Sequence, residues 1–293
     1  MSSPHPLFVG GTGRSGTHAV AKLLGRHSHY FYVSRELRFH TDRGGFPDLL
    51  SGVIDRDRFL ANMREYFWRR PGADGRERGL HSKFNKRRFE AALERFEQQY
   101  AESPEQAAAG LLGALLDPMA EEDGKSSWIE QTPQTAASAG TLYSIFPDMK
   151  LVHMVRDGRD VASSLGGQWW GPSSMRGGLK WWEKRLREAD EGSRGVPAEQ
   201  VLVLELEDLV VEDREASYVR LLDFLELKDE RKIRKNFDKH LSPANAHIGR
   251  WREGTSARRQ RRVDRAYFGV LERLHAEGVE SAPRPEKVLE RDA

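Results

Sequence analysis

A glycine-rich segment close to the N-terminus constrains the fold of this chain most strongly. Four of the eight residues in 10–17 are glycine. An apolar run at 7–9 precedes the segment and predicts a buried strand, and the apolar residues of 19–24 recur at the spacing of a helix. A strand, a glycine-rich turn and a helix in this order let backbone N–H groups and the positive end of the helix dipole surround an anion. The segment therefore predicts a phosphate-binding loop in an α/β fold.

This loop differs from the Walker A loop, G-x-x-x-x-G-K-[ST], of nucleoside triphosphatases. Gly11 and Gly16 match its two glycines, but Thr17 and His18 stand where the lysine and the Mg²⁺-binding hydroxyl belong. The cation comes earlier, at Arg14. The loop is therefore predicted to bind a phosphate-like group without that lysine and hydroxyl, which argues against an ordinary ATPase or kinase.

A second candidate anion site follows an apolar run in the middle of the chain. The run ends at Arg156, and open α/β sheets place their ligands at the carboxyl ends of their strands. Ser164 lies in the helical pattern that follows, and an arginine with a nearby hydroxyl suits a second phosphate. A core ion pair with Asp157 or Asp160 is the alternative for Arg156, and Arg159 could serve either purpose.

Together, the two elements resemble the sulfotransferase family, whose members transfer a sulfuryl group from 3′-phosphoadenosine 5′-phosphosulfate (PAPS). That family has a 5′-phosphosulfate loop of the type [K/R]-[ST]-G-T, which residues 14–17 match. Its 3′-phosphate element has an arginine at a strand end and a serine eight residues later, which Arg156 and Ser164 match. Three further segments resemble the bacterial and tyrosylprotein branch of the family: 128–133, 146–161 and 203–209. The similarity extends from about residue 5 to about residue 260.

The chain departs from the family's pattern at several positions. Gln131 replaces the lysine of W-x-E-K-T-P, and Leu206 replaces the tyrosine of Y-E-D-L. The segment around Trp251 resembles the G-x-W-[KR] phrase that closes over the nucleotide, so Arg250 and Trp251 are expected to bind the cofactor. Packing in the core is the alternative for Trp251. Residues 244–246 lack the R-K-G triplet that precedes this phrase in cytosolic members.

The resemblance implies a cofactor site built mainly on the glycine-rich loop. Its expected members, besides the four residues assigned to the nucleotide above, are Gly13, Arg14, Ser15, Gly16, Thr17 and His18. Arg14 is also expected to act in catalysis, because a cation there would stabilise charge on the leaving phosphate. Helix capping can coexist with this role for Ser15, and a structural role is the alternative for His18.

Sulfuryl transfer also needs a group that removes the acceptor proton. In the tyrosylprotein branch this base is a glutamate in an E-x-R phrase about twenty residues after the loop, and the residues of 36–38 lie at that distance. We therefore expect Glu36 as the catalytic base and Arg38 as a residue that holds the acceptor or the sulfuryl group, with a surface ion pair as the alternative. His40 and Glu130 are further candidates beside the acceptor.

The remaining chain alternates between strand and helix patterns. Further strands are expected near 30–33, 127–130, 150–155 and 201–205. This alternation predicts an α/β fold, a three-layer sandwich with a central parallel sheet that resembles the P-loop nucleotide kinases. We expect one domain over 1–280, in which 42–125 form a mainly helical insertion that shapes the acceptor pocket, and a loosely ordered tail over 281–293.

Composition limits the ligands, the chemistry and the location that we expect for this protein. The 293 residues carry a formal net charge of only +2, which gives no reason to expect binding to nucleic acid. Cysteine does not occur, which excludes disulfides, thiol catalysis and cysteine-ligated zinc. We expect no metal, because arginine and backbone dipoles would supply the positive charge that the reaction needs. Neither a signal-peptide pattern nor a long apolar run is visible, so we expect a cytoplasmic protein without a membrane span. The sequence leaves open whether the protein forms a homodimer.

The resemblance implies transfer from PAPS to an acceptor hydroxyl, with 3′-phosphoadenosine 5′-phosphate (PAP) as the product. A lipid, a glycan or a small metabolite is the expected acceptor, and Trp169 and Trp170 in a glycine-rich loop are candidates to meet an apolar or sugar group. The alternatives are a P-loop-like kinase or phosphotransferase and a non-catalytic PAP-binding protein.

Overall fold

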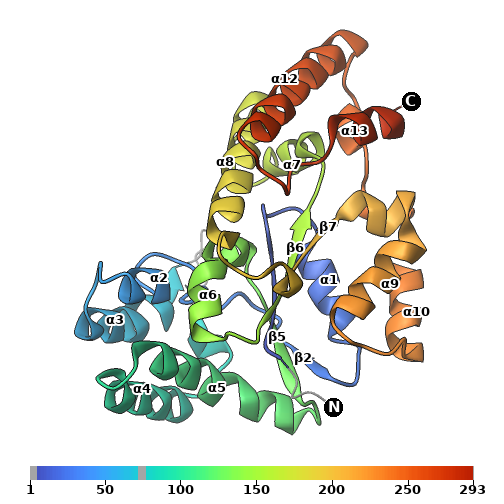
Figure 1. Ribbon diagram of the computed structural model, residues 1–293. Helices are drawn as coiled ribbons and strands as arrows, with labels where there is room; N and C mark the ends of the chain where they lie inside the picture. The colour runs from blue at the N-terminus through green and yellow to red at the C-terminus, as the bar shows by residue number, and fades with distance from the viewer. Residues whose placement is uncertain (1–4, 72–76, 293) are drawn as a thin grey trace.

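The computed structural model describes residues 5–71 and 77–292. A five-stranded sheet in the order β2-β5-β1-β6-β7 lies at its centre, and all of its strand pairs are parallel (Figure 1). Its strands are β1 (Leu7–Gly11), β2 (Tyr30–Tyr32), β5 (Ser127–Gln131), β6 (Lys150–Val155) and β7 (Val201–Glu205). The strands that the sequence predicts are therefore confirmed. Strands β1 and β5 are buried along their whole length, as expected for a parallel sheet covered on both faces.

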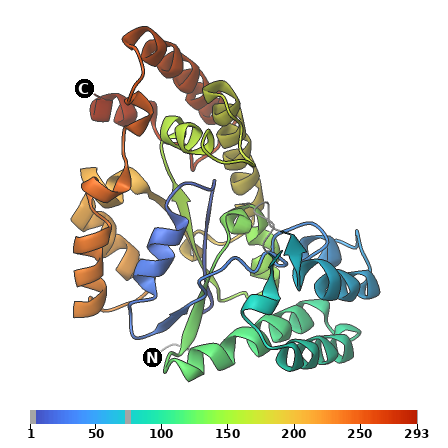
Figure 2. The ribbon, with the colours of Figure 1, turned by 180° about the vertical axis from the view of Figure 1, so that it is seen from behind.

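One face of the sheet is covered by α1 (Thr17–Leu24), α9 (Arg214–Phe224) and α10 (Arg231–His240). The opposite face is covered by α6 (Ala139–Ile145) and α8 (Met175–Ser193). Successive side chains of β1 point to opposite faces, so Leu7 and Val9 pack with α1 while Phe8 packs with the helices on the other side. Figures 1 and 2 show the two helical layers on either side of the sheet. The predicted three-layer α/β sandwich is confirmed.

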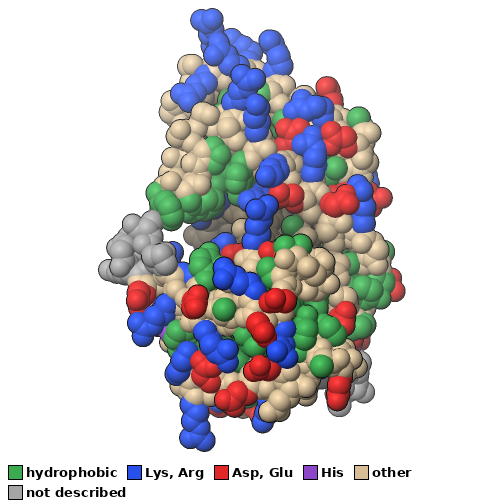
Figure 3. Space-filling view, turned by 90° about the vertical axis from the view of Figure 1, so that its left-hand side faces the viewer, with side chains coloured by type: hydrophobic (Ala, Val, Ile, Leu, Met, Phe, Trp, Pro, Cys, Tyr) green, Lys and Arg blue, Asp and Glu red, His purple; other side chains and the backbone are tan. Residues whose placement is uncertain are grey.

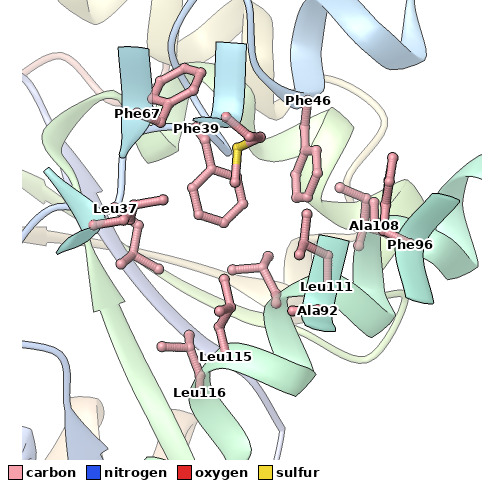
Figure 4. Close-up of a cluster of buried hydrophobic side chains, with 14 of the residues drawn as sticks. Leu37, Phe39, Phe46, Phe67, Ala92, Phe96, Ala108, Leu111, Leu115 and Leu116 are labelled. Atoms are coloured by element: carbon pink, nitrogen blue, oxygen red, sulfur yellow. The ribbon is translucent and has the colours of Figure 1, made fainter. Parts of the chain in front are cut away.

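The segment 42–125 forms a helical body beside the β2 edge. Its helices are α2 (Phe46–Leu50), α3 (Arg56–Asn62), which continues into a π-helical turn (Met63–Phe67), α4 (Lys86–Tyr100) and α5 (Pro104–Glu122). A short hairpin of β3 (Arg70–Pro71) and β4 (Glu77–Arg78), which the sequence analysis did not foresee, interrupts the helices. Phe39, Phe46, Phe96 and Leu111 are among the side chains that join this body to the rest of the core (Figure 4).

The C-terminal part differs from expectation. Residues after Ser281, expected to be loosely ordered, instead form α13 (Pro285–Asp292). Proline at a first helical position suits a helix start, and Val288 is fully buried. Arg291 donates to Asp157 at 2.8 Å, so an ion pair distant in sequence anchors the helix.

Of the remaining elements, two pack against α8 around a further buried cluster, α7 (Gly158–Leu165) and α12 (Ala257–Ala276). The others are α11 (Pro243–Ala246), a π-helical turn (Asp208–Glu212) and four short 3₁₀ turns (Leu80–Ser82, Pro133–Ser138, Ala198–Gln200 and Arg250–Arg252). In the described part of the chain, no helix has the length and apolar character needed to cross a membrane.

Candidate active site

A cleft of about 780 Å³ opens at the carboxyl ends of the strands. Residues that end or follow each of the five strands contribute to its lining: Gly13 and Arg14 (β1), Ser34 to Leu37 (β2), Gln131 and Pro133 (β5), Arg156 (β6), and Leu206 (β7). Figure 3 shows a hollow between the upper and lower parts of the molecule, with Lys and Arg side chains at its rim. This is the edge where open α/β sheets bind ligands, and the volume suits a small-molecule site.

The glycine-rich loop adopts the conformation of an anion cradle. Gly13, Arg14 and Gly16 have φ values of 78°, 59° and 89°, a left-handed region that costs energy for arginine. The φ of Gly16 favours glycine, and a Cβ there would also lie 2.9 Å from a methyl group of Leu206. Helix α1 begins at Thr17 without a side-chain cap or an acidic residue in its first turn. Its free N–H groups therefore face the cleft as an anion site.

Side chains of the loop divide between the cleft and the protein interior. The Nε of Arg14 donates to Oγ of Ser164 at 2.9 Å, so the loop is tied to α7. Thr17 Oγ1 lies 3.4 Å from the side-chain oxygen of Gln131. Ser15, expected in the cofactor site, is fully buried and does not line the cleft.

Arg156 connects the loop to the C-terminal segment. Its guanidinium donates to the carbonyl of Arg14 at 3.2 Å and to that of His247 at 2.9 Å, and it also lies 3.7 Å from the Asp160 carboxylate. Asp160 in turn accepts hydrogen bonds from the N–H groups of Gly249 and Trp251. Arg156 therefore lies where the phosphate loop, β6 and the C-terminal segment meet.

The core ion-pair alternative also describes Arg159, while Arg156 keeps its 3.7 Å pair with Asp160. Its side chain is only 1% exposed and bonds to Asp157, Asp264 and Asp292. Burial acts to lower the pKa of the guanidinium, but the three carboxylates outweigh burial and raise it. Arg159 therefore stays charged. Arg159 supports the site from behind and does not line the cleft.

Glu36 lines the cleft beside Arg38. The Nη1 of Arg38 donates to Oε2 of Glu36 at 3.0 Å, while its Nε donates to Asp42 at 2.7 Å. Arg38 has a φ of 68°, a second non-glycine residue in the left-handed region near the cleft. Burial raises the pKa of the Glu36 carboxyl, the Arg38 guanidinium opposes this rise, and the Glu130 carboxylate adds to it. A carboxylate with a raised pKa is a stronger proton acceptor.

His40 and Glu130, expected beside the acceptor, are instead fully buried below the cleft. The Nε2 of His40 lies 2.9 Å from Oε2 of Glu130, and both side chains are 0% exposed. Glu130 also accepts hydrogen bonds from the Leu37 N–H at 3.0 Å and the Thr132 hydroxyl at 2.7 Å. Neither residue lines the cleft, so the pair anchors the loop that carries Glu36 and is not placed to touch an acceptor.

His18 faces the cleft from the first turn of α1. Its Nδ1 lies 2.7 Å from the Tyr32 hydroxyl, and this contact joins the start of α1 to the end of β2. Burial, followed by the positive charge of Lys22, lowers the pKa of the imidazole. His18 is therefore a neutral hydrogen-bonding group near pH 7.

Arg250 and Trp251, expected in the cofactor site, are not among the lining residues of the cleft. The Arg250 side chain is 61% exposed and lies 3.9 Å from Glu253. Trp251 is buried, with the guanidinium groups of Arg159 and Arg252 each 4.7 Å from its ring. Trp251 therefore packs in the core, which was the alternative to a role in cofactor binding.

The structure also adds cleft residues that the sequence analysis missed. Among them are Arg35, Arg70, Glu77, Arg78, Lys83, Val210, His240, Leu241, Asn245, Ala246 and His247. The side chain of Trp170, one of the candidates for acceptor contact, does line the cleft, and Trp169 is largely exposed elsewhere. Among the residues that the structure describes, no group of three His, Asp or Glu side chains is arranged to hold a metal ion.

Comparison with known proteins decides the class of this site. A model of the sulfotransferase family matches residues 6–231. The chain belongs to the sulfotransferase family. A search of curated proteins finds no match. The cleft is therefore the candidate active site of a sulfotransferase family member.

The chain is also similar to several solved structures. The sulfotransferase domain of the Synechococcus PCC 7002 olefin synthase is 19% identical, with a TM-score of 0.52 over 92% of this sulfotransferase and 95% of that chain. Sulfotransferase STF1 from Mycobacterium tuberculosis H37Rv is 14% identical (TM-score 0.47, 92% and 77% covered). Retinol dehydratase in complex with androsterone and the inactive cofactor PAP is 16% identical (TM-score 0.43, 92% and 82% covered). At these identities the first match supports the fold alone.

Proposed function

We propose that this sulfotransferase transfers a sulfuryl group from PAPS to an acceptor hydroxyl and releases PAP. One observation carries the proposal: a single cleft contains the Arg14 loop, Arg156 and Glu36, which follow β1, β6 and β2. Two anion-binding elements and a carboxyl of raised pKa are the groups that sulfuryl transfer requires. A kinase would instead need the lysine and hydroxyl of a Walker A loop, which this loop lacks.

The nucleotide half of the cleft fits PAPS. The N-terminus of α1 and the backbone around Gly13 and Gly16 would bind the 5′-phosphosulfate, and His18 would donate or accept a hydrogen bond there. Arg156 would bind the 3′-phosphate, because its buried Nε has no hydrogen-bond partner within the described residues. Leu206 would provide an apolar surface for the adenine.

The reacting groups would lie between Arg14 and Glu36. As the acceptor oxygen forms a bond to sulfur, its proton passes to the Glu36 carboxylate. The bond between sulfur and the bridging oxygen breaks, and its electron pair stays on the 5′-phosphate of PAP. Arg14 stabilises that charge, and Arg38 holds the Glu36 carboxylate in place. Lipids, glycans and small metabolites are the acceptor classes we propose to test first.

Isothermal titration with PAP and with ATP, both in EDTA, tests the nucleotide half. We expect tight binding of PAP and weak binding of ATP, because only PAP offers a phosphate to each anion site. ATP binding that needs Mg²⁺, together with no response to PAP, would support a phosphotransferase instead. Radiolabelled PAPS then tests transfer: PAP binding without transfer to any acceptor class would favour a non-catalytic PAP-binding protein.

A further inference from the structure

The β2 side of the cleft carries more positive than negative charge. Four cationic side chains line it: Arg35 in the loop after β2, and Arg70, Arg78 and Lys83 in the helical insertion. The carboxylates of the same region are Glu36 and Glu77. Glu36 is bonded to Arg38 at 3.0 Å, and Glu77 is bonded to Arg69 at 3.0 Å. Each carboxylate is thus engaged by an arginine outside the set of four.

Two of these cations have no carboxylate partner among the described residues, and Arg70 shares its partner with Arg38. Within the described residues, no carboxylate lies within 4.0 Å of Arg35 or Lys83, and the Nζ of Lys83 is held by the hydroxyl of Ser34 at 2.5 Å. Arg70 is only 19% exposed, and its nearest carboxylate, Asp42 at 3.9 Å, is already bonded to Arg38. Like charges in a partly buried cleft repel, and a bound anion relieves this repulsion.

The electrostatics of Lys83 reflect this crowding. Burial lowers the pKa of its ammonium, and the positive charge of Arg35 lowers it further. A solvated surface lysine would not show this effect. Both cations line the same cleft, so their charges act on one volume.

The sheet order separates these cations from the nucleotide elements. Arg14 follows β1 and Arg156 follows β6, whereas Arg35 follows β2, with β5 between β2 and β1. At about 5 Å for each strand spacing, this places β2 about 10 Å from β1. The phosphates of the nucleotide already have cations of their own, so the surplus charge faces the acceptor.

We propose that the acceptor carries an anionic group, a carboxylate, phosphate or sulfate, beside the hydroxyl that is sulfated, and that Arg35, Arg70 and Lys83 bind this group. The inference rests on the proposed function, since it assigns the β2 side of the cleft to the acceptor. It narrows the acceptor to compounds such as acidic sugars, hydroxy acids or phosphorylated alcohols. A neutral lipid would leave these cations without a partner.

The test measures binding of simple anions to the PAP-saturated protein. PAP fills the nucleotide sites first, and inorganic phosphate, sulfate and acetate are then titrated separately and followed by calorimetry. We expect at least one of them to bind, with an affinity that falls tenfold or more in the Arg35→Gln/Lys83→Gln variant. A control variant, Arg58→Gln/Lys184→Gln, removes the same charge from α3 and α8 outside the cleft and should bind anions as the wild type does.

The outcomes separate the two proposals. If PAP binds but none of the three anions binds to the PAP-saturated protein, the anionic-acceptor inference is wrong. It is also wrong if the Arg35→Gln/Lys83→Gln variant retains anion binding. In both cases the proposed nucleotide site is still supported. If PAP affinity itself falls in the Arg35→Gln/Lys83→Gln variant, these cations belong to the nucleotide and the inference is also wrong. If wild-type protein does not bind PAP at all, the proposed function fails.

Discussion

The Nε of Arg14 donates a hydrogen bond to the hydroxyl of Ser164 at 2.9 Å. These residues are 150 positions apart, and each was expected at a different phosphate of the nucleotide. The bond therefore ties the glycine-rich loop to α7, the helix that follows Arg156. It also holds the Arg14 side chain, so loss of either partner is expected to affect the same step.

Replacing Arg14 with alanine should slow sulfuryl transfer strongly. We expect kcat to fall by about 10²-fold or more, because a cation at the leaving phosphate stabilises charge that develops in the transition state. Steady-state rates with radiolabelled PAPS measure the effect. Ser164→Ala, which leaves the guanidinium but removes its partner, should cause a smaller loss. Equal rates for Arg14→Ala and wild type would rule out the catalytic role.

Replacing Arg156 with alanine should weaken PAP much more than adenosine 5′-phosphosulfate, which lacks the 3′-phosphate. A charged hydrogen bond contributes about 1.5–3 kcal/mol, so a loss of tenfold or more in PAP affinity is expected. Isothermal titration with both ligands measures the difference. Because Arg156 also bonds to three backbone carbonyls, thermal unfolding of the variant must be compared with wild type. An equal loss for both ligands would refute the 3′-phosphate role.

Replacing Glu36 with glutamine should remove the base and leave nucleotide binding intact. General-base catalysis typically contributes 10²–10⁴-fold, so kcat should fall by about that factor while PAP affinity is unchanged. In wild type, activity should fall as the pH drops through the raised pKa of Glu36, above the ordinary value of 4.5. A pH–rate profile measures this limb, and a near-native rate in the variant would show that another group is the base.

Stability should depend on the buried carboxyl of Glu207. Burial raises its pKa to about 7, against the opposing charge of Arg291, from an ordinary value of 4.5. Between these values the folded protein binds the proton more tightly than the unfolded chain, so the free energy of unfolding falls as the pH rises from about 4.5 to about 7. At ~1.4 kcal/mol for each pKa unit, the fall amounts to about 3 kcal/mol.

Urea unfolding across this pH range tests the Glu207 prediction. Glu207→Gln keeps an oxygen that accepts the Asp157 N–H bond but cannot titrate, so its stability should be flatter between pH 5 and 7. A decline as steep as that of wild type would assign the pH dependence to other groups. Asp157 should not produce the same fall in stability between pH 5 and 7. Burial alone would raise its pKa, but Arg159 and Arg291 outweigh burial and lower it. The stability that Asp157 adds is therefore lost only in acid.

The sheet and the central site residues were predictable because their signals are local. Buried parallel strands form apolar runs, and the ends of such strands meet at one edge, so Arg14 and Arg156 could be placed together from the sequence. Glu36 and Arg38 were found from a short motif, and the structure places them in contact at 3.0 Å. Their catalytic roles stay predictions, as do the cytoplasmic location and the homodimer.

Other parts of the site depend on contacts between distant segments. The pairing of His40 with Glu130 joins the loop after β2 to β5, and no spacing in the sequence indicates that both side chains are buried. Lys83 reaches the cleft only because the insertion folds back over β2. The left-handed conformation of His247 was likewise not foreseen, since histidine is not the usual residue for it.

The contacts of α13 have a consequence for how ligand binding and local unfolding are linked. Arg291 bonds to Asp157, the residue directly after Arg156. Asp292 bonds to Arg159, which lies in the turn that follows. A ligand on Arg156 that favours this arrangement must also favour the docked helix, by thermodynamic reciprocity. Amide hydrogen exchange in 285–292 should therefore slow when PAP is added, although no residue of that helix lines the cleft. Unchanged exchange would show that the helix and the nucleotide site open independently.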